Sequence, residues 1–361
     1  MTSNAPTSAL QKLGQSLWLD NITRDLLDSG TLKRYIAALS ITGLTSNPTI
    51  FDNAISKSTW YDKEICRQLE SGTSGEALFF RLAIQDLCRA AELFLPIYER
   101  TGTVDGFVSL EVSPLFAYDT AATIAQAKAL HAQVNRPNLF IKIPGTKEGL
   151  PAIEESIFAG VPVNVTLLFS AAQYQAAAGA YMKGLERRVA AGLPVDVRSV
   201  ASLFVSRWDV AVADKIPADL CNKLGVAVSK LAYKSYHDIL ESDRFQRLAN
   251  LGARAQRLLF ASTGTKDKSA SDTLYIGALA APNTVNTMPQ ATLLAFADHG
   301  GATTALPRDG GDAQSTLARY SAAGIDLMAL AEQLQSDGAK SFVKSWQDLL
   351  AAIASKSKAL S

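Results

Sequence analysis

The stretch "NLFIKIPGTKEGLPAIEE" (residues 138–155) places one lysine, Lys142, inside a run of apolar residues. A short apolar run that ends at a Pro-Gly turn and leads into a helical pattern is typical of a buried strand. Side chains alternate along a strand, so Leu139, Ile141 and Ile143 share one face while Phe140 and Lys142 share the other. Burying an ammonium costs several kcal/mol unless it is paired, neutralised or used in chemistry. The lysine therefore needs an explanation.

Eight runs of this kind alternate with longer stretches of helical periodicity. In chain order they are "SLWLDN" (16–21), "GLTSNP" (43–48), "GFVSLEV" (106–112), "NLFIKIP" (138–144), "PVNVTLLF" (162–169), "SVASLFV" (199–205), "RLLFAST" (257–263) and "NTVNTMP" (283–289). Strands that alternate with helices indicate a parallel sheet, and eight strands close a (β/α)8 barrel. We therefore expect an α/β protein with the TIM-barrel architecture.

Two segments are too long for simple connections. Residues 51–104 hold two or three helices after the second strand, and residues 300–361 add helices after the eighth. In the last helix, apolar residues at i, i+4, i+7, i+8 and i+11 form one face. These residues are Phe342, Trp346, Leu349, Leu350 and Ile353. We expect a single barrel domain over residues 1–361, with both helical segments packed on it.

The composition limits the classes of function. Of the 361 residues, 48% are hydrophobic, and 35 basic and 34 acidic residues give a net charge of +1 without a basic block, which argues against nucleic acid as a partner. The polar start "MTSNAPTSALQKLGQ" (1–15) is no signal peptide, and no run of 18 apolar residues could span a membrane. We expect a cytoplasmic protein without a membrane partner, as a monomer or a homodimer.

The cysteines and histidines are few and scattered. The three cysteines have no CxxC spacing and the three histidines form no HxxxH motif, so we expect reduced thiols and no metal. These residues are Cys66, Cys88, Cys221, His131, His237 and His299. We expect no cofactor either.

Polar residues recur at the ends of the predicted strands, where barrel enzymes carry their chemistry. They are Asp20, Asn47, Glu111, Lys142, Asn164, Thr166, Ser202 and Ser262. A single such residue has a simple structural explanation: Asp20 and Asn21, like Asp119 or Ser170, could cap the next helix. Seven strands that each deliver a polar residue to one rim indicate a functional site.

Lys142 has two interpretations at this rim. It could be a structural lysine paired with Glu111 or Asp20. Alternatively, it is a nucleophile, because burial favours the free amine, which attacks a carbonyl to form an imine. The protonated imine then accepts electrons while a neighbouring carbon–carbon bond breaks. That chemistry needs carboxylates to move protons, and Asp20 and Glu111 are available.

Two segments resemble the signature sequences of the transaldolase family. They are "GLTSNPTIF" (43–51) and "LFIKIPGTKEGLPAIEE" (139–155), and four further segments match in the expected order: "SLWLDNITRDLL" (16–27), "VSLEVSPLFAYD" (108–119), "VNVTLLFS" (163–170) and "SLFVSR" (202–207). The match runs from about residue 15 to residue 300, and the C-terminal tail is similar to that of the longer bacterial subgroup. The resemblance implies a Schiff-base (β/α)8 enzyme of the non-oxidative pentose phosphate pathway. Such enzymes move a dihydroxyacetone unit from sedoheptulose 7-phosphate to glyceraldehyde 3-phosphate, giving erythrose 4-phosphate and fructose 6-phosphate.

The resemblance also implies roles for individual residues. Lys142 forms the imine, Asp20 takes the proton from the substrate hydroxyl, and Glu111 acts with Thr166 through a water. The dihydroxyacetone hydroxyls are held by Asn47, Asn164 and Ser202.

For the phosphate, the resemblance implies Arg207 and Ser262. Short members of the family carry a further arginine just after that serine, where this chain has "ASTGTKDKS" (261–269), and we assign its place to Lys266. Lys266 and Lys268 could instead be solvated in a polar loop. Neither this loop nor "GTKEG" (145–149) fits the P-loop of nucleotide-binding proteins.

Three alternatives remain at this point. A fructose 6-phosphate aldolase releases free dihydroxyacetone, and the resemblance implies that such enzymes have glutamine and tyrosine where this chain has Glu111 and Phe204. A non-catalytic sugar-phosphate-binding protein would not need Lys142, Asp20 and Glu111 together. A pyridoxal phosphate enzyme also uses a lysine imine, but no residue is placed by motif to hold the pyridinium nitrogen.

Overall fold

Eight parallel strands form the centre of the molecule, as the sequence predicts. The computed structural model describes residues 6–301 and 304–360. The strands are β1 (Ser16–Asp20), β2 (Ile41–Thr45), β3 (Val108–Glu111), β4 (Leu139–Pro144), β5 (Val163–Leu168), β6 (Ser199–Phe204), β7 (Gln256–Ala261) and β8 (Val285–Met288). Their order is β2-β1-β8-β7-β6-β5-β4-β3. Backbone hydrogen bonds from Leu44 N to Phe107 O and from Gly106 N to Thr42 O join the two ends, so the sheet closes into a barrel.

The alternation of side chains divides the apolar residues into two cores. Leu139, Ile141 and Ile143 belong to the large core between the strands and the outer helices. Phe140 belongs to the second core, which fills the barrel interior with residues such as Trp18. The facing predicted from the sequence of β4 is therefore confirmed.

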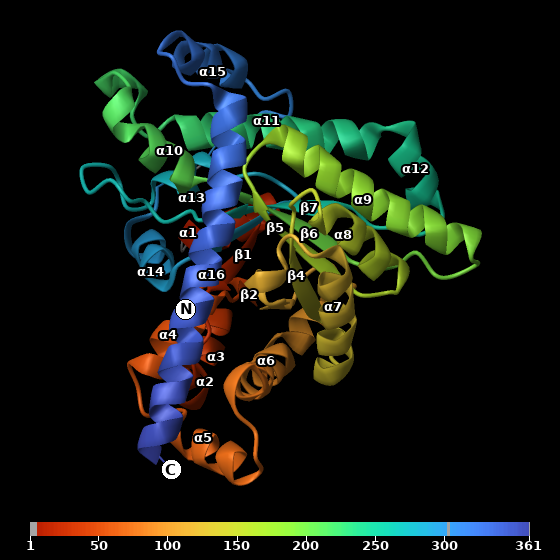
Figure 1. The fold of residues 1–361 in the computed structure, drawn as a ribbon. Coiled ribbons are helices and arrows are strands. Elements are labelled where there is room, and N and C mark those ends of the chain that lie inside the picture. The colour runs from red at the N-terminus through yellow and green to blue at the C-terminus, as the bar shows by residue number, and fades with distance from the viewer. Residues whose placement is uncertain (1–5, 302–303, 361) are drawn as a thin grey trace.

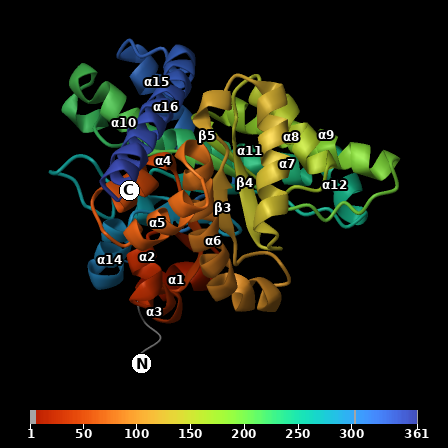
Figure 2. The same cartoon turned by 60° about the horizontal axis from the view of Figure 1, so that its bottom comes forward.

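Helices follow every strand and surround the barrel (Figures 1 and 2). They are α2 (Arg24–Asp28) and α3 (Thr31–Ala38) after β1; α4 (Pro48–Ser56), α5 (Asp62–Glu70) and α6 (Gly75–Arg100) after β2; η1 (Pro114–Phe116) and α7 (Thr120–Val134) after β3; α8 (Gly149–Phe158) after β4; α9 (Ala171–Ala190) after β5; α10 (Ser206–Val212), η2 (Ala213–Lys215), η3 (Ala218–Leu220), α11 (Leu224–Glu241) and α12 (Asp243–Asn250) after β6; α13 (Leu274–Ala278) after β7; and α14 (Gln290–His299) after β8. α1 (Pro6–Leu13) precedes β1, and α15 (Ala313–Ala322) and α16 (Leu327–Leu360) end the chain.

Side-chain caps fix where several of these helices begin. Asp119 and Ser170 accept hydrogen bonds from the first turns of α7 and α9, as the sequence suggests. Asp20 caps no helix, because Thr23 performs this role for α2. Asp20 is therefore left for the barrel mouth.

The long helix α16 crosses the carboxyl end of the barrel (Figure 1). Its predicted apolar face is buried at Phe342, Trp346, Leu349 and Ile353. Trp346 packs edge-on against Phe79 of α6, with ring centroids 4.9 Å apart. The inserted helices after β2 and the C-terminal helix thus support each other beside the mouth of the barrel.

The second strand begins and ends earlier than the sequence pattern indicates. The apolar run lies at residues 43–48, but β2 spans Ile41–Thr45. Asn47 is the N-cap of α4, where its side chain accepts a hydrogen bond from Ile50 N over 3.1 Å, and Pro48 occupies the first helical turn. Because Asn47 and Pro48 start helix α4, the strand ends at Thr45, before the end of the apolar run.

Candidate active site

Lys142 lies inside the barrel near the carboxyl end of β4. Its Nζ donates one hydrogen bond to Glu111 Oε2 and another to the carbonyl oxygen of Ser46, each over 3.0 Å. Only 6% of the lysine side chain is exposed. The pairing with Glu111 is compatible with a structural lysine as well as with a catalytic one. The groups around Lys142 are therefore needed to decide between these two roles.

Glu111 stands beside Lys142 because β3 and β4 pair in register at these two residues. Burial raises the pKa of Glu111, although the neighbouring ammonium of Lys142 opposes this shift. Among the described residues, neither Glu111 Oε1 nor the hydroxyl oxygen of Thr166 has a hydrogen-bond partner. A carboxyl with a raised pKa and a free oxygen is suited to exchange protons with a bound molecule.

Asp20 brings a second carboxyl group to the mouth from the end of β1. Thr45 donates a hydrogen bond to Asp20 Oδ1 over 2.7 Å, and the Thr45 hydroxyl lies 2.7 Å from that of Thr287. Desolvation raises the pKa of Asp20, while the Thr45 hydrogen bond and the charge of Lys142 partly offset the shift. The second carboxyl group is thus held in place by Thr45 of β2, whose hydroxyl in turn contacts Thr287 of β8.

Amide and hydroxyl groups continue the site on β5 and β6. Ser202 Oγ donates a hydrogen bond to Asn164 Oδ1 over 2.7 Å, and Asn164 Nδ2 donates one to Ser109 Oγ over 3.2 Å. Asn164 lies opposite Lys142 in the β4–β5 ladder. These two hydrogen bonds fix the orientation of the Asn164 amide immediately beside Lys142.

Two strand ends at this rim have unusual backbone conformations. Leu167 and Ser262 have φ angles of 61° and 55°, in the left-handed region that side chains disfavour. Such residues cost of the order of 1–3 kcal/mol and cluster at functional sites. In β5 the pairing register with β6 shifts at this point, directly after Thr166. The irregularity therefore lies where the barrel presents polar groups to its mouth.

A cavity of about 130 Å³ lies between these side chains. Eight of the ten residues that the sequence predicts for the site line it: Asp20, Asn47, Lys142, Thr166, Ser202, Arg207, Ser262 and Lys266. Glu111 lines a smaller adjoining cavity together with Asn47. Asn164 is fully buried and reaches the site through its hydrogen bond with Ser202. The structure thus brings all ten residues together.

One side of the cavity is cationic. The Arg207 guanidinium packs on the rings of Phe204 and Phe342, with its Cζ 5.1 Å and 5.8 Å from their centroids. Burial lowers the pKa of Arg207, and no described carboxylate forms an ion pair with it. Lys266 lies on the same cavity, and its charge partly offsets the rise that burial causes in the pKa of Asp20. Two cations that form no ion pair within residues 6–301 and 304–360 make a site suited to a phosphate group.

The C-terminal helix α16 contributes the part of the site that the sequence does not reveal. Phe342 lines the cavity, and Lys142 Nζ is 6.0 Å from the centre of its ring. Gln335 Nε2 donates hydrogen bonds to Gly145 O and Leu167 O, over 3.0 Å and 2.9 Å. At Gly338, a Cβ would lie only 2.9 Å from Leu167 Cδ2, so glycine allows the helix to approach this closely.

The sequence reveals the apolar face of α16. It does not reveal which strand ends this helix covers. Thr45 and Thr287 also line the cavity without having been predicted. Thr45 stands two residues before Asn47 within one signature segment, which was the only sequence signal for it.

The parts of the chain that the structure describes also bear on two further features, a metal site and a membrane-spanning helix. Residues 6–301 and 304–360 contain no group of three or more His, Cys, Asp or Glu side chains that could hold a metal ion. None of the described helices is both long enough and apolar enough to cross a membrane.

Comparison with known proteins assigns the family. Residues 17–353 match the family model described as Transaldolase/Fructose-6-phosphate aldolase. A protein named Transaldolase from Thiobacillus denitrificans is 44% identical over 96% of this chain and 99% of its own length. Another of that name from Mycolicibacterium smegmatis is 44% identical over 97% of each chain, and Transaldolase 2 from Nostoc is 39% identical over 98% of this chain and 97% of its own. This chain therefore belongs to the transaldolase/fructose-6-phosphate aldolase family.

Proposed function

We propose that this protein is a transaldolase that moves a dihydroxyacetone unit between sugar phosphates through an imine on Lys142. The donor is sedoheptulose 7-phosphate and the acceptor is glyceraldehyde 3-phosphate, and the reverse reaction starts from fructose 6-phosphate. The observation that carries the proposal is the buried Lys142, which is hydrogen-bonded to Glu111 and lies with Asp20 on the wall of a cavity. The same cavity contains Arg207, which forms no ion pair with any described residue.

In the first half-reaction, the amine of Lys142 attacks the C2 carbonyl of the ketose phosphate. Loss of water gives a protonated imine. The carboxylate of Asp20 then takes the proton from the C4 hydroxyl, the C3–C4 bond breaks, and its electrons move to the imine nitrogen. The aldose phosphate leaves, and an enamine of dihydroxyacetone stays on the lysine. The acceptor aldehyde reverses these steps.

Glu111 and Thr166 serve the formation and hydrolysis of the imine. Both have a buried oxygen atom without a partner in the described parts of the chain, and Glu111 Oε2 accepts a hydrogen bond from Lys142 Nζ. A water held by the two free oxygens would be the molecule that leaves and returns. The raised pKa of Glu111 allows its carboxyl group to carry the proton.

Binding of the substrate follows the polarity of the cavity. Asn47 and Ser202 present amide and hydroxyl groups to the dihydroxyacetone hydroxyls, and the buried Asn164 acts with them through its hydrogen bond from Ser202. Arg207, Ser262 and Lys266 form the phosphate end. The arginine supplies a planar fork for two phosphate oxygens, whereas the lysine acts as a point charge.

Transfer is favoured over release of free dihydroxyacetone by the residues around the imine. Phe204 stacks on Phe169, with ring centroids 5.3 Å apart, and places an apolar ring on the cavity. It carries no hydroxyl that could deliver water to the intermediate. The enamine is therefore protected until the acceptor aldehyde arrives.

Borohydride trapping tests the imine. Reduction in the presence of fructose 6-phosphate should add the reduced dihydroxyacetone fragment to the peptide that contains Lys142, as measured by mass spectrometry. An unmodified peptide would refute the proposal. The release of dihydroxyacetone from fructose 6-phosphate, with and without an acceptor aldehyde phosphate, separates transferase from aldolase. Substantial turnover without an acceptor would assign the aldolase reaction instead.

A further inference from the structure

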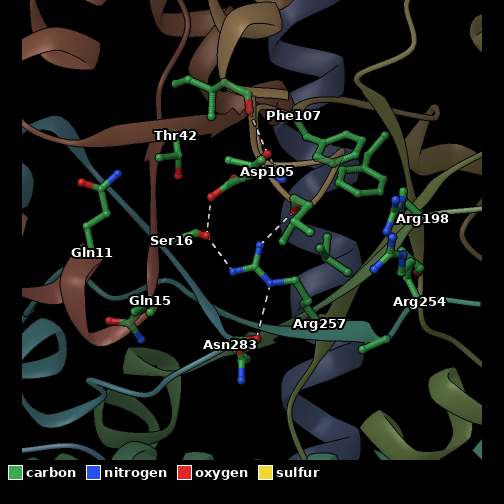
Figure 3. A pocket seen from close by; sticks show the side chains of 18 of the residues that line it. Gln11, Gln15, Ser16, Thr42, Asp105, Phe107, Arg198, Arg254, Arg257 and Asn283 are labelled. Carbon is green, nitrogen blue, oxygen red and sulfur yellow. Dashed lines mark hydrogen bonds between the residues drawn. The ribbon is translucent and has the colours of Figure 1, made fainter. Parts of the chain in front are cut away.

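A second and larger cavity lies at the opposite, amino-terminal end of the barrel. Its volume is about 420 Å³, which is within the range of small-molecule sites. It is lined by Ser16 at the start of β1, by Thr42 near the start of β2, and by residues of the segments before β3 and β7. Figure 3 shows these side chains converging from several strands.

Arginines supply the positive charge in the lining of this cavity. Arg198, Arg254 and Arg257 all reach it, as Figure 3 shows, and Arg100 at the end of α6 lines it too. Arg257 lies in the middle and donates hydrogen bonds to the Ser16 hydroxyl over 2.6 Å and to backbone carbonyl oxygens, including Thr284 O over 2.8 Å. All these partners of Arg257 are neutral oxygen atoms.

The positive charges at this end exceed the negative ones. Arg198 pairs with Asp196, which is largely exposed, with 3.0 Å between Nε and Oδ1. Arg198 and Arg254 lie next to each other on one side of the cavity (Figure 3). Burial lowers the pKa of Arg198, the charge of Asp196 opposes this shift, and the positive charge of Arg254 adds to it. In the described parts of the chain, Arg254 and Arg100 form no ion pair or side-chain hydrogen bond.

The one buried carboxylate of the cavity does not neutralise this charge by direct contact. Asp105 Oδ1 accepts hydrogen bonds from Trp18 Nε1 over 2.8 Å and from Gly106 N over 3.0 Å, and Ser16 Oγ donates to Oδ2. Asp105 therefore has its partners within the barrel. A bound anion would meet the arginines, and Asp105 would not compete for them.

The cavity also has an apolar floor, which separates it from the catalytic end. The rings of Phe107 and Phe140 line it and stack with centroids 4.2 Å apart. Phe140 lies two residues before Lys142 on the same face of β4, so this ring layer stands between the two cavities. Gln15, a residue only 1% exposed, also lines the cavity; its Oε1 atom has no partner among the described residues and can accept a hydrogen bond.

We propose that this cavity, the amino-end pocket, binds a small phosphate ester with a hydroxyl-bearing carbon part. The phosphate group lies between Arg198 and Arg254, since two guanidinium forks bind phosphate oxygens in pairs and the anion removes the repulsion between them. The carbon part rests on the Phe107–Phe140 stack, and a hydroxyl donates to Gln15 Oε1. This site is separate from the phosphate end of the catalytic cavity and does not depend on the proposed transaldolase reaction.

Calorimetric titration with inorganic pyrophosphate at low ionic strength tests the site. Pyrophosphate has no carbonyl group and cannot react with Lys142. Arg207→Gln removes the main cation of the catalytic cavity, and Arg254→Gln removes an exposed arginine from the amino-end pocket. Arg247→Gln is the matched control, because Arg247 is an exposed arginine of α12 that does not line this pocket.

The expected result is a binding event that persists in Arg207→Gln and Arg247→Gln and weakens about tenfold or more in Arg254→Gln. Loss of a hydrogen-bonded charged pair is worth about 1.5–3 kcal/mol, which corresponds to at least that factor. Pyrophosphate should also raise the melting temperature of Arg207→Gln but not that of the double variant Arg207→Gln/Arg254→Gln. The proposal is overturned if no binding occurs, or if binding disappears in Arg207→Gln and is unchanged in Arg254→Gln.

Discussion

Glu111 and Asp105 lie near opposite ends of the same short strand, β3, and they are equally buried, since each is 5% exposed. Glu111 lies at the carboxyl end of the strand. Its Oε2 atom accepts a hydrogen bond from Lys142 Nζ, and its Oε1 atom has no partner in the described parts of the chain. Asp105 lies before the amino end of the strand, where both oxygens accept hydrogen bonds from Trp18, Gly106 and Ser16. The two ends of the barrel thus treat a buried carboxyl group differently.

This difference separates a group kept for chemistry from one kept for stability. A buried polar atom without a partner costs free energy, so it persists where a bound molecule completes its hydrogen bonds. A buried carboxylate with all of its partners contributes to the fold and has little capacity left for a substrate. Substitutions at the carboxyl end should therefore reduce activity more than stability, and substitutions of Asp105 at the amino end should reduce stability more than activity.

The largest effect is expected from Lys142→Ala. Without the amine no imine forms, so kcat/KM for fructose 6-phosphate and erythrose 4-phosphate should fall by at least about 10⁴-fold. The barrel should still fold, since loss of a buried lysine stem costs only a few kcal/mol. Steady-state kinetics and circular dichroism measure the two quantities. Activity within tenfold of the wild type would remove Lys142 from the mechanism.

Glu111→Gln should have the next largest effect. The amide keeps the shape of the side chain but cannot carry a proton, so formation of the imine should slow by about 10²–10³-fold. Single-turnover trapping with borohydride measures this step directly. If the rate of trapping is unchanged while overall turnover falls, Glu111 acts at a step other than imine formation.

Asp105→Asn should reduce stability and leave activity nearly unchanged, in contrast to Glu111→Gln. The carboxamide can still accept from Trp18 and Gly106, but its amino group faces the Ser16 hydroxyl. The lost charged hydrogen bond should lower the free energy of unfolding by about 1.5–3 kcal/mol, measured by urea denaturation. The kcat/KM of the folded variant should stay close to that of the wild type. A loss of activity as large as that of Glu111→Gln would contradict the division between the two ends.

Asp20→Asn should give the smallest effect on stability, with a characteristic pH dependence. Since burial raises the pKa of Asp20 above its unfolded value of 3.8, the contribution of this group to stability is fully present below that pH and is lost as the pH rises through the folded pKa. The neutral asparagine avoids this loss, so the variant should be more stable than the wild type at neutral pH.

The stability advantage of Asp20→Asn should shrink as the pH falls toward 3.8. Urea denaturation of both proteins at a series of pH values measures the difference. An advantage that does not depend on pH would mean that the ionisation of Asp20 is not its cause. The activity of Asp20→Asn should fall at every pH, because the amide cannot take the substrate proton.

Much of the fold and the site can be predicted from sequence because both depend on short local patterns. The alternation within β4 places Lys142 inside the barrel, and the repetition of strand and helix indicates the closed sheet. The apolar pattern predicts an end of β2 later than the observed one at Thr45, because capping of α4 by Asn47 outweighs this pattern. Phe342 was assigned to the correct helix face, but its place over Lys142 depends on contacts across more than 190 residues of chain.

The sequence by itself therefore determined which residues face the barrel interior and which of them carry reactive groups, since side-chain alternation and residue chemistry are local properties. Only the tertiary structure decided how those groups are partnered. Among the described residues, Glu111 Oε1 and Thr166 Oγ1 have no hydrogen-bond partner, whereas both oxygens of Asp105 have partners. Helix α16 lies across the mouth of the barrel, and several arginines meet at the opposite end. Hydrogen bonding and desolvation depend on atoms contributed by distant parts of the chain, and these distances are set when the barrel closes.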